Sequence, residues 1–217
     1  MGINGPALVR AVVAACTIAT LTGCDSNAPV ASETGTADMS GSAATHAFRG
    51  AVPAAPMAMP DVTLRTTEGR PFNLVTDTVD PVTLVFFGYT NCPDVCPLVM
   101  SDLTLAYAEL PADVRRQTQV LYVTTDPARD TADVLRRYLD RYNPAFVGLT
   151  GRLPSIVAAA SDLGVAITGK KVLPGGGYDV GHGAQVIGFS HETAPVIWTP
   201  GTPVADMVAD ITTLAGV

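Results

Sequence analysis

The sequence predicts an α/β fold in which helices flank a central mixed sheet, and three observations lead to this prediction. Two runs, residues 82–88 and 119–125, contain the β-branched and aromatic residues of buried central strands. Each run is followed by a segment with apolar residues at helical spacing. The chain then closes with a predicted hairpin and a last helix, so its elements form an α/β sandwich.

The first part of the predicted domain contains a hairpin, a strand and a helix. The stretch "DVTLRTTEGRPFNL" (61–74) alternates around a Glu-Gly turn, as the two strands of a hairpin do. Strand 82–88 is followed by two cysteines and then by a helix, which Pro111 stops. The apolar residues that define this helix are Val99, Leu103, Ala106 and Leu110.

A second strand and two helices follow. After strand 119–125, Thr131 is expected to cap a helix. A shorter helix begins at Pro154 and ends at Gly164, with proline at the start and glycine past the end. The apolar face of the helix after Thr131 comprises Val134, Leu135, Tyr138, Leu139 and Tyr142.

The last part of the chain is expected to hold two strands, a returning strand and a helix. Residues 165–167 and 184–189 are predicted strands, and "TGKKVLPGGGYDVGHG" between them is predicted to be a loop. "PVIW" (195–198) pairs back across the turn "SHETA". Thr202 and Pro203 then cap a helix that carries Val204, Met207, Val208, Ile211 and Leu214.

Residues 1–23 have the features of an export signal. Arg10 precedes an apolar or small run of 11 residues, 11–21, which is shorter than the roughly 20 residues that cross a bilayer. The ending "LTGC" resembles the lipobox of bacterial lipoproteins and predicts that Cys24 is lipidated. The alternative is an ordinary cleaved signal followed by a free cysteine. We therefore expect an exported chain that a lipid holds at the outer face of the cell membrane.

Residues 24–57 are rich in small and polar residues and show no apolar period, which predicts a flexible tether ahead of one domain over 58–217. Loss of residues 1–23, which hold one arginine and no acid, takes the net charge from −7 to −8. An acidic domain is poorly suited to nucleic acid, because phosphate neutralisation needs Lys and Arg. The same charge disfavours adhesion to anionic lipid beyond the anchor itself.

Two cysteines, Cys92 and Cys96, remain for the folded domain once Cys16 has left with the signal and Cys24 is acylated. They lie at the end of the first central strand and at the start of a helix, a thioredoxin-like layout. The helix N-terminus favours thiolate over thiol. Helical residues four apart have β-carbons roughly 5–6 Å apart, whereas a disulfide needs about 3.5–4.5 Å. The spacing therefore suits a soft metal ion at least as well as a disulfide.

A metal at this pair would need a further donor. Thiolates select copper(I), zinc or iron–sulfur clusters, and two sulfurs are too few for a closed zinc site or a cluster. Of the three histidines, His46 lies in the tether and His191 in a turn that is expected to be exposed. His182 immediately precedes a predicted strand, and in a thioredoxin-like sheet the loop before that strand lies against the cysteine helix, where thioredoxins place a cis-proline. His182 is therefore the best third-ligand candidate.

Four segments in order resemble the Sco/SenC copper proteins: "GYTNCPDVCPLVMSDL", "VTTDPARDTADVLRRYL", "FVGLTG" and "YDVGHGAQVIGF". The resemblance covers about residues 58–217 and implies a thioredoxin-like fold with one copper ion bound by Cys92, Cys96 and His182. It also implies assembly of the copper centre of cytochrome c oxidase subunit II, as metal donor, thiol reductant or both. Asp126 matches an acidic residue that the family has near the site, and a plain turn or cap role is the alternative.

The resemblance has one departure, and several alternatives stay open. Gly181 stands where the family has an acid, which puts the orientation of His182 in question. Met57 and Met59 could offer thioethers to copper or could pack on the domain edge. Besides a copper chaperone, the chain could be a thiol–disulfide oxidoreductase, a peroxidase that uses Cys92, or a binding domain with a local disulfide. His182 separates the first two, because a reductase has no use for it.

Overall fold

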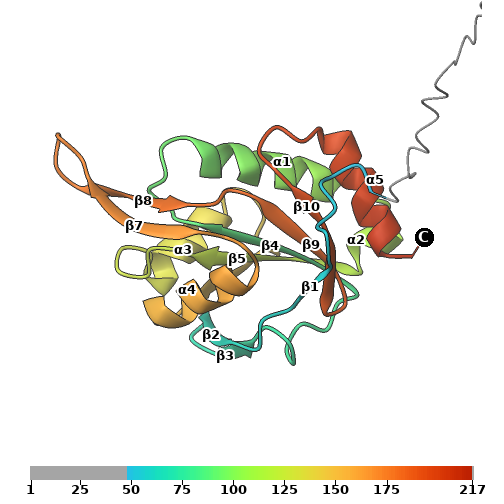
Figure 1. Cartoon of the computed structure of the whole chain (residues 1–217), viewed down its shortest axis with the longest axis horizontal. Coiled ribbons are helices and arrows are strands. Elements are labelled where there is room, and N and C mark those ends of the chain that lie inside the picture. Colours follow the sequence, from blue (N-terminus) through green and yellow to red (C-terminus); the bar gives the residue numbers. More distant parts are fainter. Residues whose placement is uncertain (1–47, 217) are drawn as a thin grey trace, which may run out of the picture. The chain divides into compact units, whose positions relative to one another are not determined.

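The structure is a computed structural model that describes residues 48–216. Within these residues, eight strands form one sheet in the order β1-β10-β9-β4-β5-β6-β2-β3 (Figure 1). The strands are β1 (Met57–Ala58), β2 (Thr63–Thr66), β3 (Pro71–Asn73), β4 (Val82–Gly88), β5 (Thr118–Thr124), β6 (Val147–Thr150), β9 (Val186–Ser190) and β10 (Thr193–Trp198). Parallel pairing joins β4, β5 and β6, and the other pairs are antiparallel.

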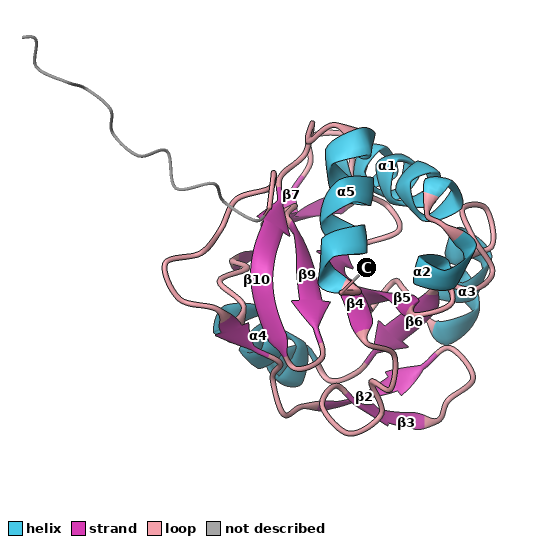
Figure 2. Ribbon diagram, turned by 90° about the vertical axis from the view of Figure 1, so that its right-hand side faces the viewer, coloured by secondary structure: helices cyan, strands magenta, loops and turns pink. Residues whose placement is uncertain are grey.

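Helices cover both faces of this sheet (Figure 2). On one face lie α1 (Val95–Glu109), α2 (Ala112–Arg115), α3 (Ala132–Leu139) and α5 (Val204–Leu214), and on the other lies α4 (Leu153–Asp162). Strand β4 is buried on both sides because its residues alternate between two cores. Leu84 and Phe86 pack under α1, whereas Val85 and Phe87 pack with α4. The predicted thioredoxin-like α/β sandwich is confirmed.

Most elements form where the sequence predicts them. The hairpin over 61–74 is β2–β3, the run 82–88 is β4, and the second buried strand is β5, one residue earlier than expected. Thr131 caps α3, since its hydroxyl accepts the N–H of Val134 at 3.4 Å. At the end of α4, Gly164 has φ +64°, a left-handed conformation that glycine adopts without strain.

The predicted loop between residues 167 and 184 is wrong. It contains β7 (Ile167–Val172) and β8 (Tyr178–His182), which pair with each other in a separate two-stranded sheet, here called the ribbon. Five of the six β7 residues are exposed, so the strand lacks the alternation of apolar and polar residues that marks a half-buried strand. The predicted strand 165–167 has only Ile167 in β7. Strand β6 and the short helix α2 were also not assigned from the sequence.

The folded domain includes residues that the sequence assigned to the tether. Ala51 pairs with Ile197 of β10, and Met57 and Ala58 form β1 beside the same strand. The Asp210 carboxylate of α5 accepts the backbone N–H groups of Arg49 and Gly50, both at 2.8 Å. Residues 48–57 therefore pack as part of the domain.

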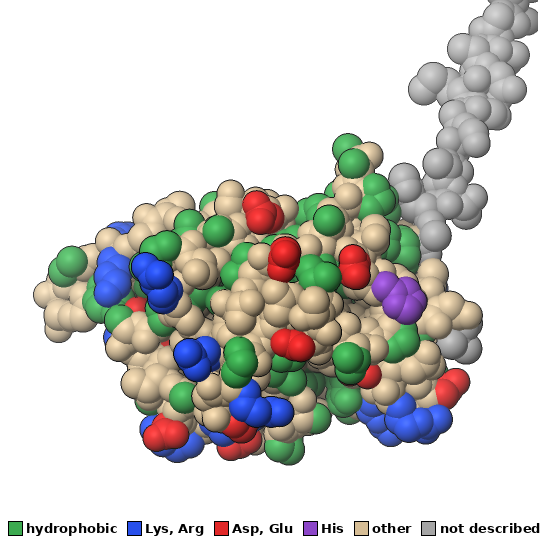
Figure 3. All heavy atoms as spheres, turned by 90° about the horizontal axis from the view of Figure 1, so that it is seen from below, with side chains coloured by type: hydrophobic (Ala, Val, Ile, Leu, Met, Phe, Trp, Pro, Cys, Tyr) green, Lys and Arg blue, Asp and Glu red, His purple; other side chains and the backbone are tan. Residues whose placement is uncertain are grey.

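The described surface mixes charges of both signs. On the face seen from below, acidic and basic side chains are interspersed with neutral surface (Figure 3). None of the helices within residues 48–216 combines the length and apolar character that a membrane crossing requires.

Candidate metal centre

The cysteine loop leaves the end of β4 and is held by a buried acid. The Asp130 carboxylate accepts the backbone N–H of Thr90 at 3.0 Å and the Thr90 hydroxyl at 2.6 Å. It also accepts the Thr124 hydroxyl at 2.6 Å, which joins the loop to the end of β5. Asp130 has no exposed surface, and burial raises the pKa of its carboxyl. These bonds fix the segment that leads to Cys92.

Cys92 lies outside helix α1, and Cys96 lies in its first turn. The helix begins at Val95, so Pro97 falls in the first turn, where proline is tolerated. The backbone N–H of Cys96 points at the Cys92 sulfur, with the nitrogen 3.4 Å from Sγ. The Asp94 side chain makes no capping hydrogen bond, so the Cys92 sulfur takes that place. Both thiols are free.

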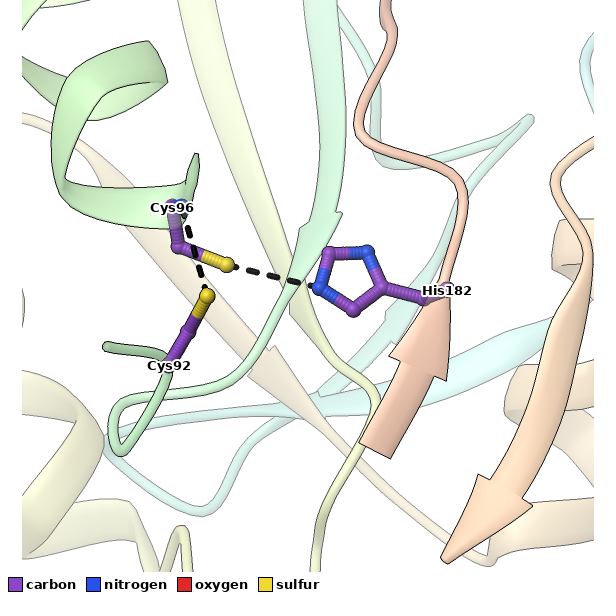
Figure 4. Close-up of side chains that lie close together, drawn as sticks. All are labelled: Cys92, Cys96 and His182. Atoms are coloured by element: carbon purple, nitrogen blue, oxygen red, sulfur yellow. Dashed lines mark hydrogen bonds between the residues drawn. The ribbon is translucent and has the colours of Figure 1, made fainter. Parts of the chain in front are cut away.

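His182 reaches this pair from the end of β8. Its Nε2 lies 3.4 Å from the Cys96 sulfur, and its Nδ1 lies 2.8 Å from the carbonyl oxygen of Gly183 (Figure 4). Because a carbonyl only accepts, Nδ1 must carry the proton, which leaves the lone pair of Nε2 directed at the sulfurs. The three ligand atoms all lie within 4.8 Å of one another.

The pKa values of the two thiols are shifted in opposite directions. The Cys96 thiol donates to Cys92 and lowers the pKa of Cys92 to about 3, with further help from backbone N–H groups. The same pairing, together with burial, raises the pKa of Cys96. Without a metal, Cys92 is therefore the thiolate and Cys96 the thiol.

Aromatic rings pack against the imidazole, and a cavity adjoins it. The rings of Phe86 and Tyr89 meet the His182 ring edge-on, with centroids 6.4 Å and 5.7 Å away. A cavity of about 330 Å³ lies between the cysteine loop and the ribbon. Cys96 is fully buried, whereas Cys92 is half-buried and lines this cavity together with Asp94 and Lys171. Access to the sulfurs is therefore through Cys92.

Comparison with known proteins gives the family. The SCO1/SenC family model matches residues 58–216. The chain belongs to the SCO1/SenC family. The mitochondrial protein SCO2 of Saccharomyces cerevisiae is 36% identical over 124 residues, which are 52% of this chain and 41% of SCO2. The chain spans less than half the length of the curated relatives it matches.

Solved SCO1/SenC structures resemble the whole domain. Apo Sco1 of Thermus thermophilus has 33% identity and a TM-score of 0.69, covering 79% of this chain and 99% of that one. Yeast Sco1 with copper bound has 28% identity and a TM-score of 0.65, covering 73% and 88%. Two thiols and an imidazole are the donors that soft copper prefers. The donor set and the copper-bound relative together support the predicted copper cofactor.

Asp126, the fourth predicted site residue of this SCO1/SenC chain, is buried but does not touch the three ligand atoms. Its carboxylate accepts the Tyr178 hydroxyl at 2.9 Å and pairs with Arg129. It therefore acts on the start of β8, four residues from His182. Asp130 was missed by the sequence reasoning, although it stands in the same "TTDPARD" segment as Asp126.

Gly181 has a local explanation. A β-carbon at this position would lie 2.1 Å from the hydroxyl oxygen of Thr168. Thr168 sits where the β7–β8 register shifts, between the pairs Ile167–His182 and Gly169–Gly181. Glycine thus stands at a place where a β7 side chain fills the space, although the resemblance led us to expect an acid there, and His182 still points at the sulfurs.

The remaining candidates fall into three groups. Met57 and Met59 pack in the core on the α4 face of the sheet, whereas the cysteines and Val180 belong to the other core, which places these thioethers in a packing role. His191 is exposed, with φ +54° in its turn. His46 and the predicted lipidation site Cys24 lie outside the described residues.

Proposed function

We propose that this SCO1/SenC protein carries one copper ion as cargo, held by Cys92, Cys96 and His182. The observation that supports this most strongly is the 3.4 Å approach of His182 Nε2 to the Cys96 sulfur, within a set of three donors less than 4.8 Å apart. A reductase would need the two sulfurs alone. The convergence of an imidazole on them favours metal binding.

The architecture suits a carrier that releases its ion. Three protein donors leave coordination positions free, and the Cys92 side opens into the cavity of about 330 Å³. An incoming thiol can therefore approach from the Cys92 side and exchange with one protein ligand at a time. Cys92 loses no proton on binding, because it is already the thiolate.

We propose cytochrome c oxidase subunit II as the partner, on the strength of the family resemblance. We further propose that residues 1–23 export the chain and that lipidated Cys24 anchors it to the outer face of the cell membrane. The "LTGC" ending and the basic start followed by a short apolar run support this placement.

A second candidate function is thiol–disulfide exchange, and the low pKa of Cys92 favours it. The Cys92 thiolate would attack one sulfur of a partner disulfide, and the partner's other sulfur would leave as a thiolate. Cys96 would then lose its proton and attack the Cys92 sulfur, which releases the second partner thiol. Two electrons pass to the partner, and a Cys92–Cys96 disulfide remains.

Titration of the reduced domain, residues 48–217, with Cu(I) in competition with a chelator tests the carrier function. We expect one tight site per chain, and we expect His182→Ala to weaken binding by at least about tenfold. The matched control is His191→Ala, because His191 is exposed and distant in the fold. Equal affinity of the wild type and His182→Ala would contradict the assignment. Reduction of a model disulfide that survives His182→Ala would support the second function.

A further inference from the structure

The segment that carries His182 has few backbone connections to the rest of the domain. Strands β7 and β8 pair only with each other, and an isolated two-stranded ribbon is marginally stable in water. At the base of the ribbon, the N–H of Gly183 donates to the carbonyl of Ala166 at 2.9 Å. The position of His182 must therefore depend on side-chain contacts between the ribbon and the domain.

One face of β8 provides these contacts. Residues 178, 180 and 182 point the same way, because side chains alternate along a strand. Val180 is 5% exposed and packs in the core beside α1, and His182 reaches the sulfurs. Tyr178, about 13 Å along the strand from His182, makes the third contact.

Tyr178 is held at three places by the loop after β5. Its hydroxyl donates to Asp126 Oδ1 at 2.9 Å, and its carbonyl accepts from Arg129 Nη1 at 2.8 Å. The Arg129 guanidinium also lies 3.7 Å from the centre of the Tyr178 ring. Asp126 is 2% exposed and pairs with the same arginine. We call Asp126, Arg129 and Tyr178 the ribbon clamp.

The clamp also contacts a ring that packs against the imidazole. Arg129 lies 5.7 Å from the centre of the Tyr89 ring, and that ring packs edge-on against His182. Tyr89 in turn donates its hydroxyl to Asp179 of β8 at 3.3 Å. One arginine thus supports both the strand that carries His182 and the ring that packs against its imidazole.

We propose that Tyr178 is a positioning residue, and that the ribbon clamp sets whether His182 stays within reach of Cys92 and Cys96. With the clamp closed, the site has three donors. When the Tyr178 contacts open, the ribbon moves away and the two sulfurs remain, the state from which copper passes to an incoming thiol. This inference rests on the proposed carrier function and assigns the control of release to residues outside the ligand set.

Tyr178→Phe tests the clamp, because it removes the hydroxyl and keeps the ring. In the metal-free domain we expect amide hydrogen exchange at residues 178–182 to be about tenfold faster, since a bond to a buried carboxylate is lost. With Cu(I) loaded, we expect dissociation to a chelator to be faster by a similar factor. The matched control is Tyr107→Phe, whose hydroxyl meets the Arg115 carbonyl at the other end of α1.

If the proposal holds, the effect of Tyr178→Phe on copper dissociation requires His182. In a His182→Ala background, Tyr178→Phe should leave the rate of copper dissociation unchanged, and a persisting acceleration would overturn the proposal. Unchanged ribbon exchange or unchanged copper dissociation in Tyr178→Phe alone would overturn it too. Asp126→Asn is a second variant with the same expected results if Tyr178→Phe does not fold.

The two proposals fail in distinguishable ways. If copper binding does not depend on His182, the carrier assignment fails, while hydrogen exchange in the metal-free domain still reports on the clamp. If wild type and His182→Ala differ but Tyr178→Phe behaves like wild type, the clamp alone is wrong.

Discussion

His182 Nε2 lies 3.4 Å from the Cys96 sulfur, although 86 residues separate the two in the chain. The sulfur belongs to the first turn of a helix, and the imidazole belongs to a ribbon outside the main sheet. Two independent pieces of structure thus meet at one point. The first is fixed by Asp130 and the second by Tyr178, which makes both supports open to experiment.

The cysteines should differ in reactivity in the metal-free protein. Since the pKa of Cys92 is lowered to about 3, its thiolate fraction is already complete in weak acid, whereas Cys96 stays a buried thiol. We expect the rate of iodoacetamide labelling at Cys92 to be nearly flat from about pH 5 to pH 8, with Cys96 unlabelled, as read by mass spectrometry. A Cys92 rate that rises tenfold per pH unit over this range would contradict the assignment.

Asp130 should stabilise the cysteine loop more through the hydrogen bonds that its oxygens accept than through its negative charge. Asp130→Ala leaves three donors without a partner and should lower the free energy of unfolding by about 3 kcal/mol. Asp130→Asn keeps part of the acceptor capacity and should cost less. Urea denaturation at neutral pH measures both, and equal losses would show that the amide oxygen cannot replace the carboxylate.

The same residue predicts a pH dependence. Because burial raises the pKa of Asp130 above its ordinary value of 3.8, the stabilising contribution of its protonated form is fully present below that value. It is lost as the pH rises through the raised pKa in the folded protein. The unfolding free energy of Asp130→Asn should therefore increase relative to that of the wild type as the pH rises from about 4 to 7. A difference in unfolding free energy that does not change with pH would argue against a raised pKa.

Introducing at position 181 the acid that the family resemblance predicts should require a second change. In Gly181→Asp the new β-carbon meets the Thr168 hydroxyl, which lies 2.1 Å from its position, so we expect a loss of about 1–3 kcal/mol in unfolding free energy. Thr168→Ala removes that oxygen, and the Thr168 β-carbon at 3.5 Å is an ordinary contact. The double variant should recover most of the loss in a double-mutant cycle. Additive losses would show that the two positions do not compete for space.

The N-terminal segment should detach when its buried carboxylate is removed. Asp210 accepts from the N–H groups of Arg49 and Gly50 and from the Trp198 indole, each at 2.8 Å. Asp210→Ala should open residues 48–58 to protease and change the Trp198 fluorescence, while Cu(I) affinity stays at the wild-type value. Asp206→Ala is the matched control, because its bond to Arg49 is exposed and such pairs contribute little. Equal protease sensitivity of both variants would contradict a role for Asp210.

The sequence predicted the elements whose signals are local. Strand β4 is apolar on both sides, and Thr131 caps a helix with one apolar face, so neither needs information from elsewhere in the chain. The ribbon could not be found in this way, because β7 is exposed and is defined by its partner β8. The three residues of the candidate centre were found because cysteine and histidine are rare in the domain.

The supports of that centre were found only in part. Asp126 was named from the family resemblance, but its contact with Tyr178 joins residues 52 apart, and Asp130 binds Thr90 across 40. An acid in a turn gives the same sequence signal whether it caps the turn or reaches a distant strand. Long-range hydrogen bonds of this kind depend on the assembled topology, and no local pattern encodes them.

The Asp210 contacts also determine how the domain would respond to being pulled from its N-terminal side. Any force that travels along the chain toward residue 48 meets the bonds of Arg49 and Gly50 to α5, and then the pairing of Ala51 and β1 with β10. The ribbon belongs to a different sheet and takes no part in these bonds. Mechanical load from the proposed membrane anchor would therefore be borne by the rim of the main sheet, leaving the imidazole and the two sulfurs undisturbed.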